Sequence, residues 1–402
     1  MSEFLKVIKN GTCIGCGYCS SFTNSKMQFN KHGFLEPEID ELKALSLSES
    51  TKIDHSCPGL NGADVVACNE KDNNCDYMWG KYNFVGTAYS SDPHIRHLGS
   101  SGGAITAISS WLLKSGRVNS VLNTVYSNKE PISTESKISN NLDELPDGAG
   151  SKYSPSSPLS ILGGLRGKGG VHAIIGRPCD ISTLRRAIES SNDFCKEKFV
   201  LIAFFCAGTP SRKGNEELLE YIGIDNPEEV IKFRHRGNGW PGFTTAILRD
   251  GTSKQCTYNE AWGGILRRHT NALCKICPDG IGEQADIVAA DAWYGDSGGY
   301  PDFDEKDGRS LLISRSEVGL SLVKAAIKEG ALISEPLSIR EIDAMQPGQL
   351  NRRKQLRMRV LAFKFLGRKT PSYNLSALKK YERGMSRVNK IKVFFKTLKK
   401  II

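Results

Sequence analysis

The chain has 402 residues, a length that predicts two or three cores rather than one small domain. Hydrophobic residues make up 39% of it and charged residues 24%, which excludes wholesale disorder, collagen and coiled coil. The net charge of +10 comes from the C-terminal end, because residues 351–402 hold 17 Lys or Arg and one acid, leaving 37 bases and 43 acids in the rest.

No apolar run approaches the length that spans a bilayer, and the longest candidate is residues 199–205. The first residues also lack the apolar stretch of a signal peptide, so we expect a cytoplasmic protein. Disulfides are rare in that compartment, and the chain has 12 Cys. The cysteine content therefore predicts metal ligation or redox chemistry.

Strands and helices are predicted to alternate from residue 85 onward, which indicates an α/β layer structure. The expected strands are 85–89, 118–122, 171–175, 199–205, 285–290 and 310–314. The expected helices begin after the Gly pair at 102–103 and cover 181–188 and 318–329. Residues 124–150 are polar and predicted to be a loop, and the Pro and Ser content of residues 150–158 excludes a regular element there.

The first cysteine motif is C-x2-C-x2-C at Cys13, Cys16 and Cys19, with glycines between the thiols. Glycines allow the backbone to wrap around a cubane and bring N–H groups toward sulfur, so the spacing favours a [4Fe–4S] loop. A zinc site is the alternative, although zinc sites favour paired C-x2-C units. No Cys-Pro follows closely, so the fourth ligand must lie elsewhere. Cys57, which precedes Pro58, is the first candidate, ahead of the alternatives Cys68 and Cys75.

The second cysteine set is dispersed over Cys179, Cys206, Cys274 and Cys277. Cys179 and Cys206 each follow a predicted buried strand, and strand ends of an α/β sheet converge on ligand sites. From spacing alone, the four thiols suit a [4Fe–4S] cluster and a zinc ion about equally.

Five motifs in order resemble the coenzyme F-420 hydrogenase/dehydrogenase β-subunit family, which includes 7-hydroxymethyl chlorophyll a reductase. The motifs are SSGGAITAI, GSKYSPS, GRPCDISTLR, FCAGTPS and CKICPDGIGEQADIVAADAW. The resemblance implies an α/β flavoprotein core with FAD and one or two [4Fe–4S] clusters. It also implies that the second cysteine set ligates a cluster and that the N-terminal triplet belongs to a ferredoxin-like segment.

The same resemblance implies that FAD lies against the segments around residues 101–106 and 152–154. A helix beginning after the glycines would present N–H groups to a pyrophosphate, although a Gly pair at a helix start more often reflects packing. The lysine of the second segment can approach a phosphate or the flavin edge, and the tyrosine can stack. The predicted FAD-binding residues are Ser101, Gly102, Gly103, Thr106, Lys152, Tyr153 and Ser154.

Residues 233–243 place Arg234, His235, Arg236 and Trp240 among glycines. That composition suits an anionic or planar ligand near the flavin, and a turn with a buried Trp and solvated arginines is the alternative. Asp286 and Asp291 are expected to cap helices or turns rather than to donate protons. Cys195 and Cys256 are expected to be free thiols.

The sequence predicts four parts, which are a ferredoxin-like segment at 1–80, a flavin-binding part at 81–165, a cluster-bearing part at 166–345 and a basic helical tail at 346–402. The predicted function is electron transfer between a reduced carrier (deazaflavin coenzyme, ferredoxin or NAD(P)H) and a metabolite or glycan precursor. A noncatalytic subunit that feeds a partner enzyme, as in a surface-polysaccharide pathway, is the alternative.

The tail interleaves its bases with apolar residues, so residues 390–402 can form a helix with one apolar and one basic face. Such a helix suits peripheral contact with the inner face of a membrane. A helix docked on the acidic body is the alternative. Nucleic-acid binding is the weakest interpretation of these charges.

Overall fold

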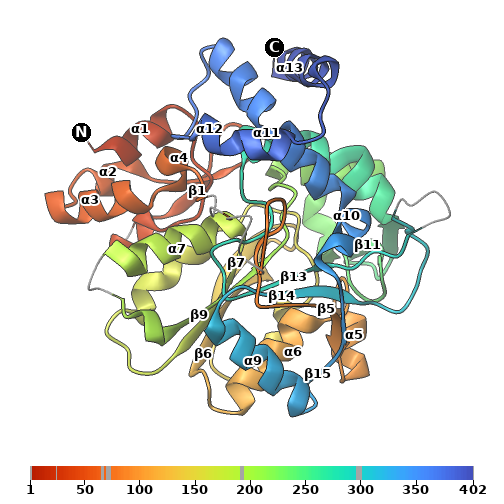
Figure 1. Cartoon of the computed structure of the whole chain (residues 1–402). Helices are drawn as coiled ribbons and strands as arrows, with labels where there is room; N and C mark the ends of the chain where they lie inside the picture. Colours follow the sequence, from red (N-terminus) through yellow and green to blue (C-terminus); the bar gives the residue numbers. More distant parts are fainter. Residues whose placement is uncertain are drawn as a thin grey trace.

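The computed structural model describes residues 2–23, 25–64, 68, 74–190, 194–295 and 301–401, and its centre is an eight-stranded mixed sheet. The strand order is β15-β5-β14-β13-β9-β8-β6-β7 (Figure 1). The adjacent strands β13, β9, β8 and β6 are parallel to one another, and every other neighbouring pair in the sheet is antiparallel. The strands are β5 (Phe84–Ser90), β6 (Ser120–Tyr126), β7 (Thr134–Ser139), β8 (His172–Gly176), β9 (Phe199–Phe204), β13 (Ile287–Asp291), β14 (Ser310–Ser314) and β15 (Leu332–Pro336).

Helices cover both faces of this sheet because its central strands are apolar on both sides. Alternate residues of β9 show the division, since Val200 and Ile202 join one core and Leu201 and Ala203 the other. The first core includes α6 (Ala104–Lys114) and α9 (Glu317–Lys328), and the second includes α7 (Pro178–Ser190) and α11 (Pro347–Phe365). The predicted α/β layer structure is therefore confirmed.

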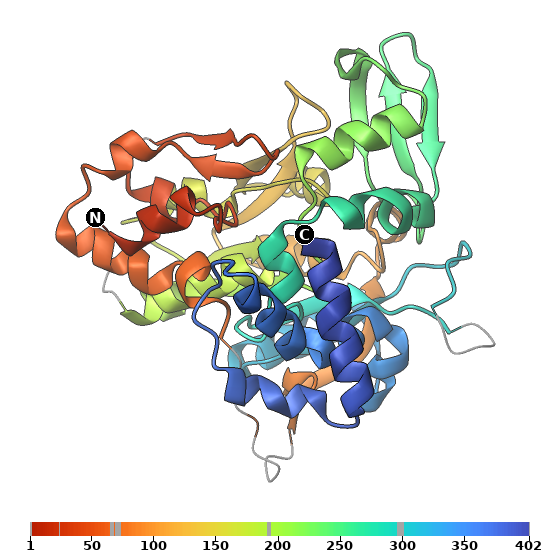
Figure 2. The ribbon, with the colours of Figure 1, turned by 90° about the horizontal axis from the view of Figure 1, so that it is seen from above.

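Two smaller parts flank the sheet. The N-terminal segment contains α1 (Glu3–Lys9), β1 (Met27–Phe29), β2 (Leu35–Pro37), α2 (Ile39–Leu42), α3 (Leu47–Ser56) and α4 (Pro58–Asn61). A third core lies under a three-stranded sheet, which projects from the body in Figure 2. That part comprises α8 (Arg212–Tyr221), β10 (Val230–Arg234), β11 (Thr244–Leu248) and β12 (Ser253–Cys256).

The C-terminal tail is helical, with α11 followed by α12 (Leu375–Leu378) and α13 (Arg387–Ile401). The short helices α5 (Pro93–Leu98) and α10 (Ile342–Met345) and the two-residue strands β3 (Cys75–Asp76) and β4 (Gly80–Lys81) complete the α-helices and strands. In the described part of the chain, no helix combines the length and apolarity needed to cross a membrane. Ile402, the last residue of the predicted tail helix, lies outside the described residues.

The prediction of a loop across 124–150 is wrong, because β6 runs to Tyr126, β7 follows, and Leu142–Gly148 forms a 3-10 helix. The strand β7 reads TESKIS and lies at the edge of the sheet, where most of its side chains are only partly buried. An edge strand needs no apolar alternation, so its polar sequence concealed it. The other predicted strands and helices are confirmed, with shifted ends, and the boundaries at 80, 165 and 345 stay predictions.

Candidate functional site

The first candidate site is a pocket in the N-terminal segment that four cysteines line together. We call this set the N-terminal cysteine group, and it consists of Cys13, Cys16, Cys19 and Cys57. The first three come from the loop after α1, and the fourth lies between α3 and α4. Gly17 has φ of 82°, and a Cβ there would lie 2.7 Å from Ser160 N, so this turn requires glycine. The loop thus brings the C-x2-C-x2-C thiols to Cys57, as the sequence predicts.

Burial dominates the electrostatics of the N-terminal cysteine group. Burial and, to a smaller extent, the neighbouring thiols together raise the pKa of the Cys13, Cys16 and Cys57 thiols to about 12. Four thiolates can share this pocket only around a cationic centre, because each charge is otherwise desolvated beside like charges. Gly15 N–H also donates to Cys13 Sγ over 3.4 Å, a contact that iron–sulfur sites use. The donor set therefore fits a [4Fe–4S] cluster.

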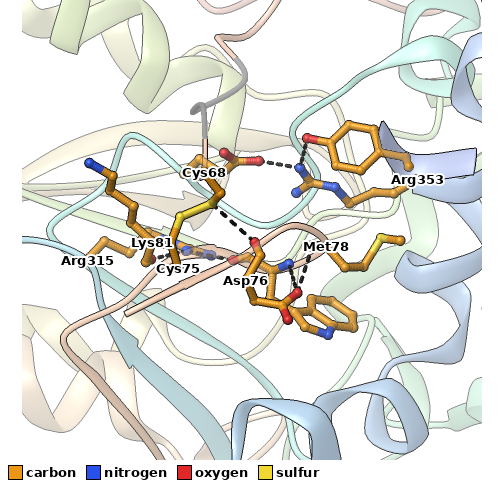
Figure 3. Close-up of a disulfide and its surroundings, with 10 residues drawn as sticks. Cys68, Cys75, Asp76, Met78, Lys81, Arg315 and Arg353 are labelled. Atoms are coloured by element: carbon orange, nitrogen blue, oxygen red, sulfur yellow. Dashed lines mark hydrogen bonds and ion pairs between the residues drawn. A yellow bond between two sulfur atoms is a disulfide. The ribbon is translucent and has the colours of Figure 1, made fainter. Parts of the chain in front are cut away.

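The two alternative fourth ligands, Cys68 and Cys75, are joined to each other in a disulfide (Figure 3). Neither lines the pocket of the N-terminal cysteine group. The disulfide differs from the expectation of reduced thiols throughout the chain. Cys195 and Cys256 are free, as predicted.

The second candidate site collects the dispersed cysteines, which we call the central cysteine group: Cys179, Cys206, Cys274 and Cys277. Cys179 lies in the first turn of α7 and Cys206 follows β9, so adjacent parallel strands deliver both to the same edge of the sheet. Cys179, Cys274 and Cys277 line one pocket, and a Cβ on Gly208, two residues after Cys206, would lie 3.1 Å from Cys274 Cβ. The structure therefore brings the predicted second set together.

Backbone donors and space around the central cysteine group also fit a cluster. Thr209 N–H donates to Cys274 Sγ over 3.5 Å. In the described part of the chain, no three His, Cys, Asp or Glu side chains are placed to hold a single metal ion. A cubane is larger than one ion, and the four thiols of the central cysteine group would be its ligands.

Arg177 connects the two cysteine groups. Its side chain is buried and forms a fork to Asp180, with Nε 2.8 Å from Oδ2 and Nη2 2.7 Å from Oδ1. Its Nη1 donates to Ile14 O in the N-terminal loop over 3.5 Å and to Thr209 Oγ1 near the central group over 3.1 Å. Sequence reasoning missed this role, although Arg177 lies two residues before Cys179 in the GRPCD motif.

The helix α11 also supports the central cysteine group, which the sequence did not predict for the basic tail. Gln349 Nε2 donates to Cys206 O over 3.0 Å, and Arg352 Nη1 donates to the same oxygen over 3.2 Å. Arg352 also donates to Cys274 O. The first half of the tail is therefore a structural part of this site.

A cavity of about 280 Å³ extends from the start of α6 to Cys206. Six of the seven predicted FAD-binding residues line it: Ser101, Gly103, Thr106, Lys152, Tyr153 and Ser154. Gly102 does not line it, since its N–H donates to Ser310 Oγ over 3.0 Å and a Cβ would lie 2.5 Å from Ala88 O. The conformation at Gly102 thus serves packing, and the first turn of α6 faces the cavity with unpaired helix N–H groups that favour an anion.

Lys152 is a buried cation beside this cavity. Its Nζ donates to Gly148 O over 2.9 Å and to Ala149 O and Gly150 O over 3.2 Å. Burial, with a smaller contribution from the charge of Arg234, lowers the pKa of Lys152 to about 7. The side chain therefore changes charge near neutral pH.

Asp291 lines the cavity and pairs with Arg236 rather than capping a helix or turn. Each oxygen of Asp291 accepts from Arg236 over 3.0 Å, and Trp240 Nε1 donates to Asp291 Oδ1 over 2.9 Å. Arg236 and Trp240 are both buried. The predicted turn with a buried Trp is therefore confirmed, but the prediction that its arginines are solvated is wrong for Arg236. Burying the guanidinium requires a paired acid, which a local sequence window does not reveal. Tyr258 and Trp293 add an aromatic wall that can stack on a planar ring.

His235 is fully buried beside Tyr153, and its surroundings favour the neutral ring. Its Nε2 lies 2.6 Å from Asn215 Oδ1, and its Nδ1 accepts from Tyr153 N–H over 3.3 Å. A proton on Nδ1 would point at the Tyr153 N–H, so this contact favours the neutral ring. Burial lowers the pKa of His235 to about 3.

We expect this histidine to make the fold acid-sensitive. Its folded pKa lies below the ordinary value of about 6.5, so the unfolded state binds the extra proton first as pH falls. The free energy of unfolding should decline by up to about 1.4 kcal/mol per pH unit between pH 6.5 and 3. Urea unfolding at several pH values checks this. His235→Gln should remove that component of the slope, exposed His94→Gln should keep it, and equal slopes in both variants would contradict the assignment.

Comparison with known proteins then identifies the family. Sequence profiles described as coenzyme F420 hydrogenase/dehydrogenase, beta subunit, match residues 85–163 with the N-terminal part and 171–339 with the C-terminal part. The chain belongs to this family. The resemblance carried by the five motifs is thereby confirmed.

Curated relatives are named as redox proteins. Coenzyme F420 hydrogenase subunit beta of Methanothermobacter thermautotrophicus is 25% identical over 67% of this chain and 88% of its own length. Coenzyme F420-dependent sulfite reductase of Methanocaldococcus jannaschii is 25% identical over 84% of this chain, which spans only 50% of that protein. A chain of the F420-reducing [NiFe] hydrogenase complex of Methanosarcina barkeri shares the fold, with a TM-score of 0.57, 19% identity and coverage of 74% of this chain and 98% of that one.

Proposed function

We propose that the chain is an iron–sulfur flavoprotein oxidoreductase with FAD and two [4Fe–4S] clusters. The observation that carries the proposal is spatial: the cavity lined by the predicted FAD-binding residues ends at Cys206, and Arg177 links the central cysteine group to the N-terminal one. A bound flavin exchanges electrons in pairs and clusters exchange them singly, so this order connects a hydride carrier to a one-electron partner. The names of the relatives favour a deazaflavin coenzyme as that carrier.

The residues of this chain supply binding and orientation. Lys152 and the start of α6 present positive charge to a pyrophosphate, and Tyr153 offers a face for stacking. The fork from Arg236 fixes Asp291 in the lining of the same cavity. Mostly half-buried cysteines, with backbone N–H donors at Cys13 and Cys274, would hold the two clusters. Ferredoxin and NAD(P)H are the alternative carriers, and a small metabolite is the acceptor class.

A noncatalytic electron-transfer subunit is the second candidate function. Two of the similar proteins carry the word subunit or complex in their names, which favours a partner enzyme as the acceptor. Oxidation of the reduced, purified chain by a candidate metabolite in the absence of any partner would support the enzyme. Reduction by deazaflavin without oxidation by any metabolite would support the subunit.

The direct test is cofactor analysis of protein purified without oxygen. We expect about eight iron and eight acid-labile sulfide per chain, four of each per cubane, with FAD released on denaturation. About four iron would leave one group without a cluster. Zinc in place of iron would contradict the redox proposal.

Lys152→Met is expected to weaken FAD binding by about tenfold to a hundredfold, because it removes a positive charge beside the proposed phosphate site. Because the amine is charged mainly below its pKa of about 7, FAD affinity of the unmodified chain should also decline above that pH. Fluorescence titration of the deflavinated chain measures both effects. Lys129→Met, at an exposed position, serves as the control. If Lys152→Met leaves the pH dependence of FAD affinity unchanged, the phosphate does not bind beside Lys152.

A further inference from the structure

The helix α13 is docked on α11 through one face only. Phe394 contacts Phe365 edge to face with ring centroids 5.8 Å apart. At the start of the helix, Lys390 Nζ lies 2.8 Å from Glu382 Oε2, a buried carboxylate that also lies 3.3 Å from Arg357 Nη1. Figures 1 and 2 both show α13 beside α11 on the outside of the body. The tail helix is therefore docked, although these contacts lie on α11 and Glu382 of the tail itself rather than on the acidic body.

The outward face of α13 carries an apolar stripe. Val388, Ile391 and Phe395 follow the spacing of one helix face, and their side chains are 60%, 56% and 56% exposed. Large side chains of this kind are normally scattered singly over a surface. Three on one face of a terminal helix indicate a surface that binds something apolar.

Positive charge surrounds the stripe. The helix holds six bases and no acid: Arg387, Lys390, Lys392, Lys396, Lys399 and Lys400. Bases from other segments converge on its end, since partial burial lowers the pKa of Lys400 and repulsion from Lys396, Arg359, Lys275 and Arg267 lowers it further. Like charges held this close repel one another, so an anionic partner would relieve a repulsion that the chain alone retains.

We propose that α13 docks the protein on an anionic lipid surface. Val388, Ile391 and Phe395 enter the boundary between headgroups and acyl chains, and the flanking lysines contact the headgroups. Phe and aliphatic residues on one face with Lys and Arg beside them are the composition of helices that lie in a membrane interface. An acidic protein would match the charges, but a convex single-helix stripe without a groove fits a fluid lipid surface better.

Docking would also orient the redox site, although the proposal does not depend on the proposed function. Lys275 lies between Cys274 and Cys277, and it belongs to the basic surface at the end of α13. Arg359 of α11 also donates to Lys275 O over 3.4 Å. The central cysteine group would therefore lie on the membrane side of the body.

Sedimentation with vesicles tests the charge requirement. At low salt, the full chain should bind vesicles of equal parts phosphatidylcholine and phosphatidylglycerol, and it should not bind pure phosphatidylcholine. Lys392→Gln with Lys396→Gln should weaken binding about 30-fold, from about 1 kcal/mol per base near the lipid. Lys324→Gln with Lys328→Gln, two exposed bases of α9, is the matched control and should leave binding unchanged. Equal binding to both lipids would overturn the electrostatic part.

A second pair of variants tests the apolar stripe. Ile391→Ser with Phe395→Ser should weaken vesicle binding at least about tenfold, because serine removes the apolar surface that would enter the lipid. Val318→Ser with Ile333→Ser removes two similarly exposed side chains elsewhere and should have no effect. Unchanged binding of the first pair would overturn the proposal. Light scattering without lipid tests whether the stripe instead binds a second copy of the chain. A dimer of the unmodified chain that becomes a monomer in Ile391→Ser with Phe395→Ser would assign the stripe to self-association and overturn the proposal.

Discussion

Replacing Cys57 by serine is expected to lower the iron content of the chain from about eight atoms to about four. Cys57 lines the same pocket as Cys13, Cys16 and Cys19, and no other cysteine lines that pocket among the described residues. Three thiolates leave one iron of a cubane without a protein ligand. The cluster should then be lost during purification, and iron and sulfide analysis with the visible absorption spectrum would measure the loss.

Two matched variants make this result specific. Cys195→Ser removes an exposed free thiol outside both groups and should keep about eight iron. Cys68→Ser opens the disulfide to Cys75 and should keep them as well. FAD and the central cluster should remain in Cys57→Ser. Full iron content in this variant, or loss of iron in Cys68→Ser, would show that the fourth ligand is misassigned.

The sequence predicted those parts of the fold whose signal is local. The apolar runs at residues 171–175 and 199–205 became β8 and β9, because strands buried on both faces need near-continuous apolar residues. The cysteine loop was also predictable, since the C-x2-C-x2-C spacing and its glycines lie within nine residues. The edge strand β7 was not, because a partly exposed strand pairs through its backbone and needs no pattern of side chains.

The site was predictable only where one motif contains all of its determinants. Six predicted FAD-binding residues do line one cavity, and the assignment of FAD to it stays a prediction. The pairing of Arg236 with Asp291 spans 55 residues, and the contact of Arg352 with Cys206 spans 146. Such pairs are fixed by how the sheet and α11 assemble, so a single sequence carries no local trace of them. The tail contains one example of each kind. Its amphipathic pattern could be predicted from the sequence, but the contacts between α11 and the central cysteine group could not.

The buried fork between Arg177 and Asp180 leads to the second large expected effect. Arg177→Met should lower the free energy of unfolding by about 3–5 kcal/mol, because Asp180 is fully buried and would keep an uncompensated charge. The same change removes donors to Ser156 O and Thr209 Oγ1, which lie on the loops beside the cavity and the central group. Denaturant unfolding of the anaerobic protein measures the loss.

A double-mutant cycle separates the charge from the contacts of Arg177. Arg177→Met with Asp180→Asn removes both charges, so it should recover a large part of the lost stability. Without the guanidinium beside them, clusters held by the two cysteine groups should be harder to reduce, and electrochemical titration of the cluster signals should show both potentials becoming more negative in Arg177→Met. Arg177→Lys keeps the charge and loses the planar fork, so it should hold the potentials near those of the unmodified chain while remaining less stable. If Arg177→Met leaves both potentials in place, Arg177 acts only as a structural bridge between the loops that carry the two groups.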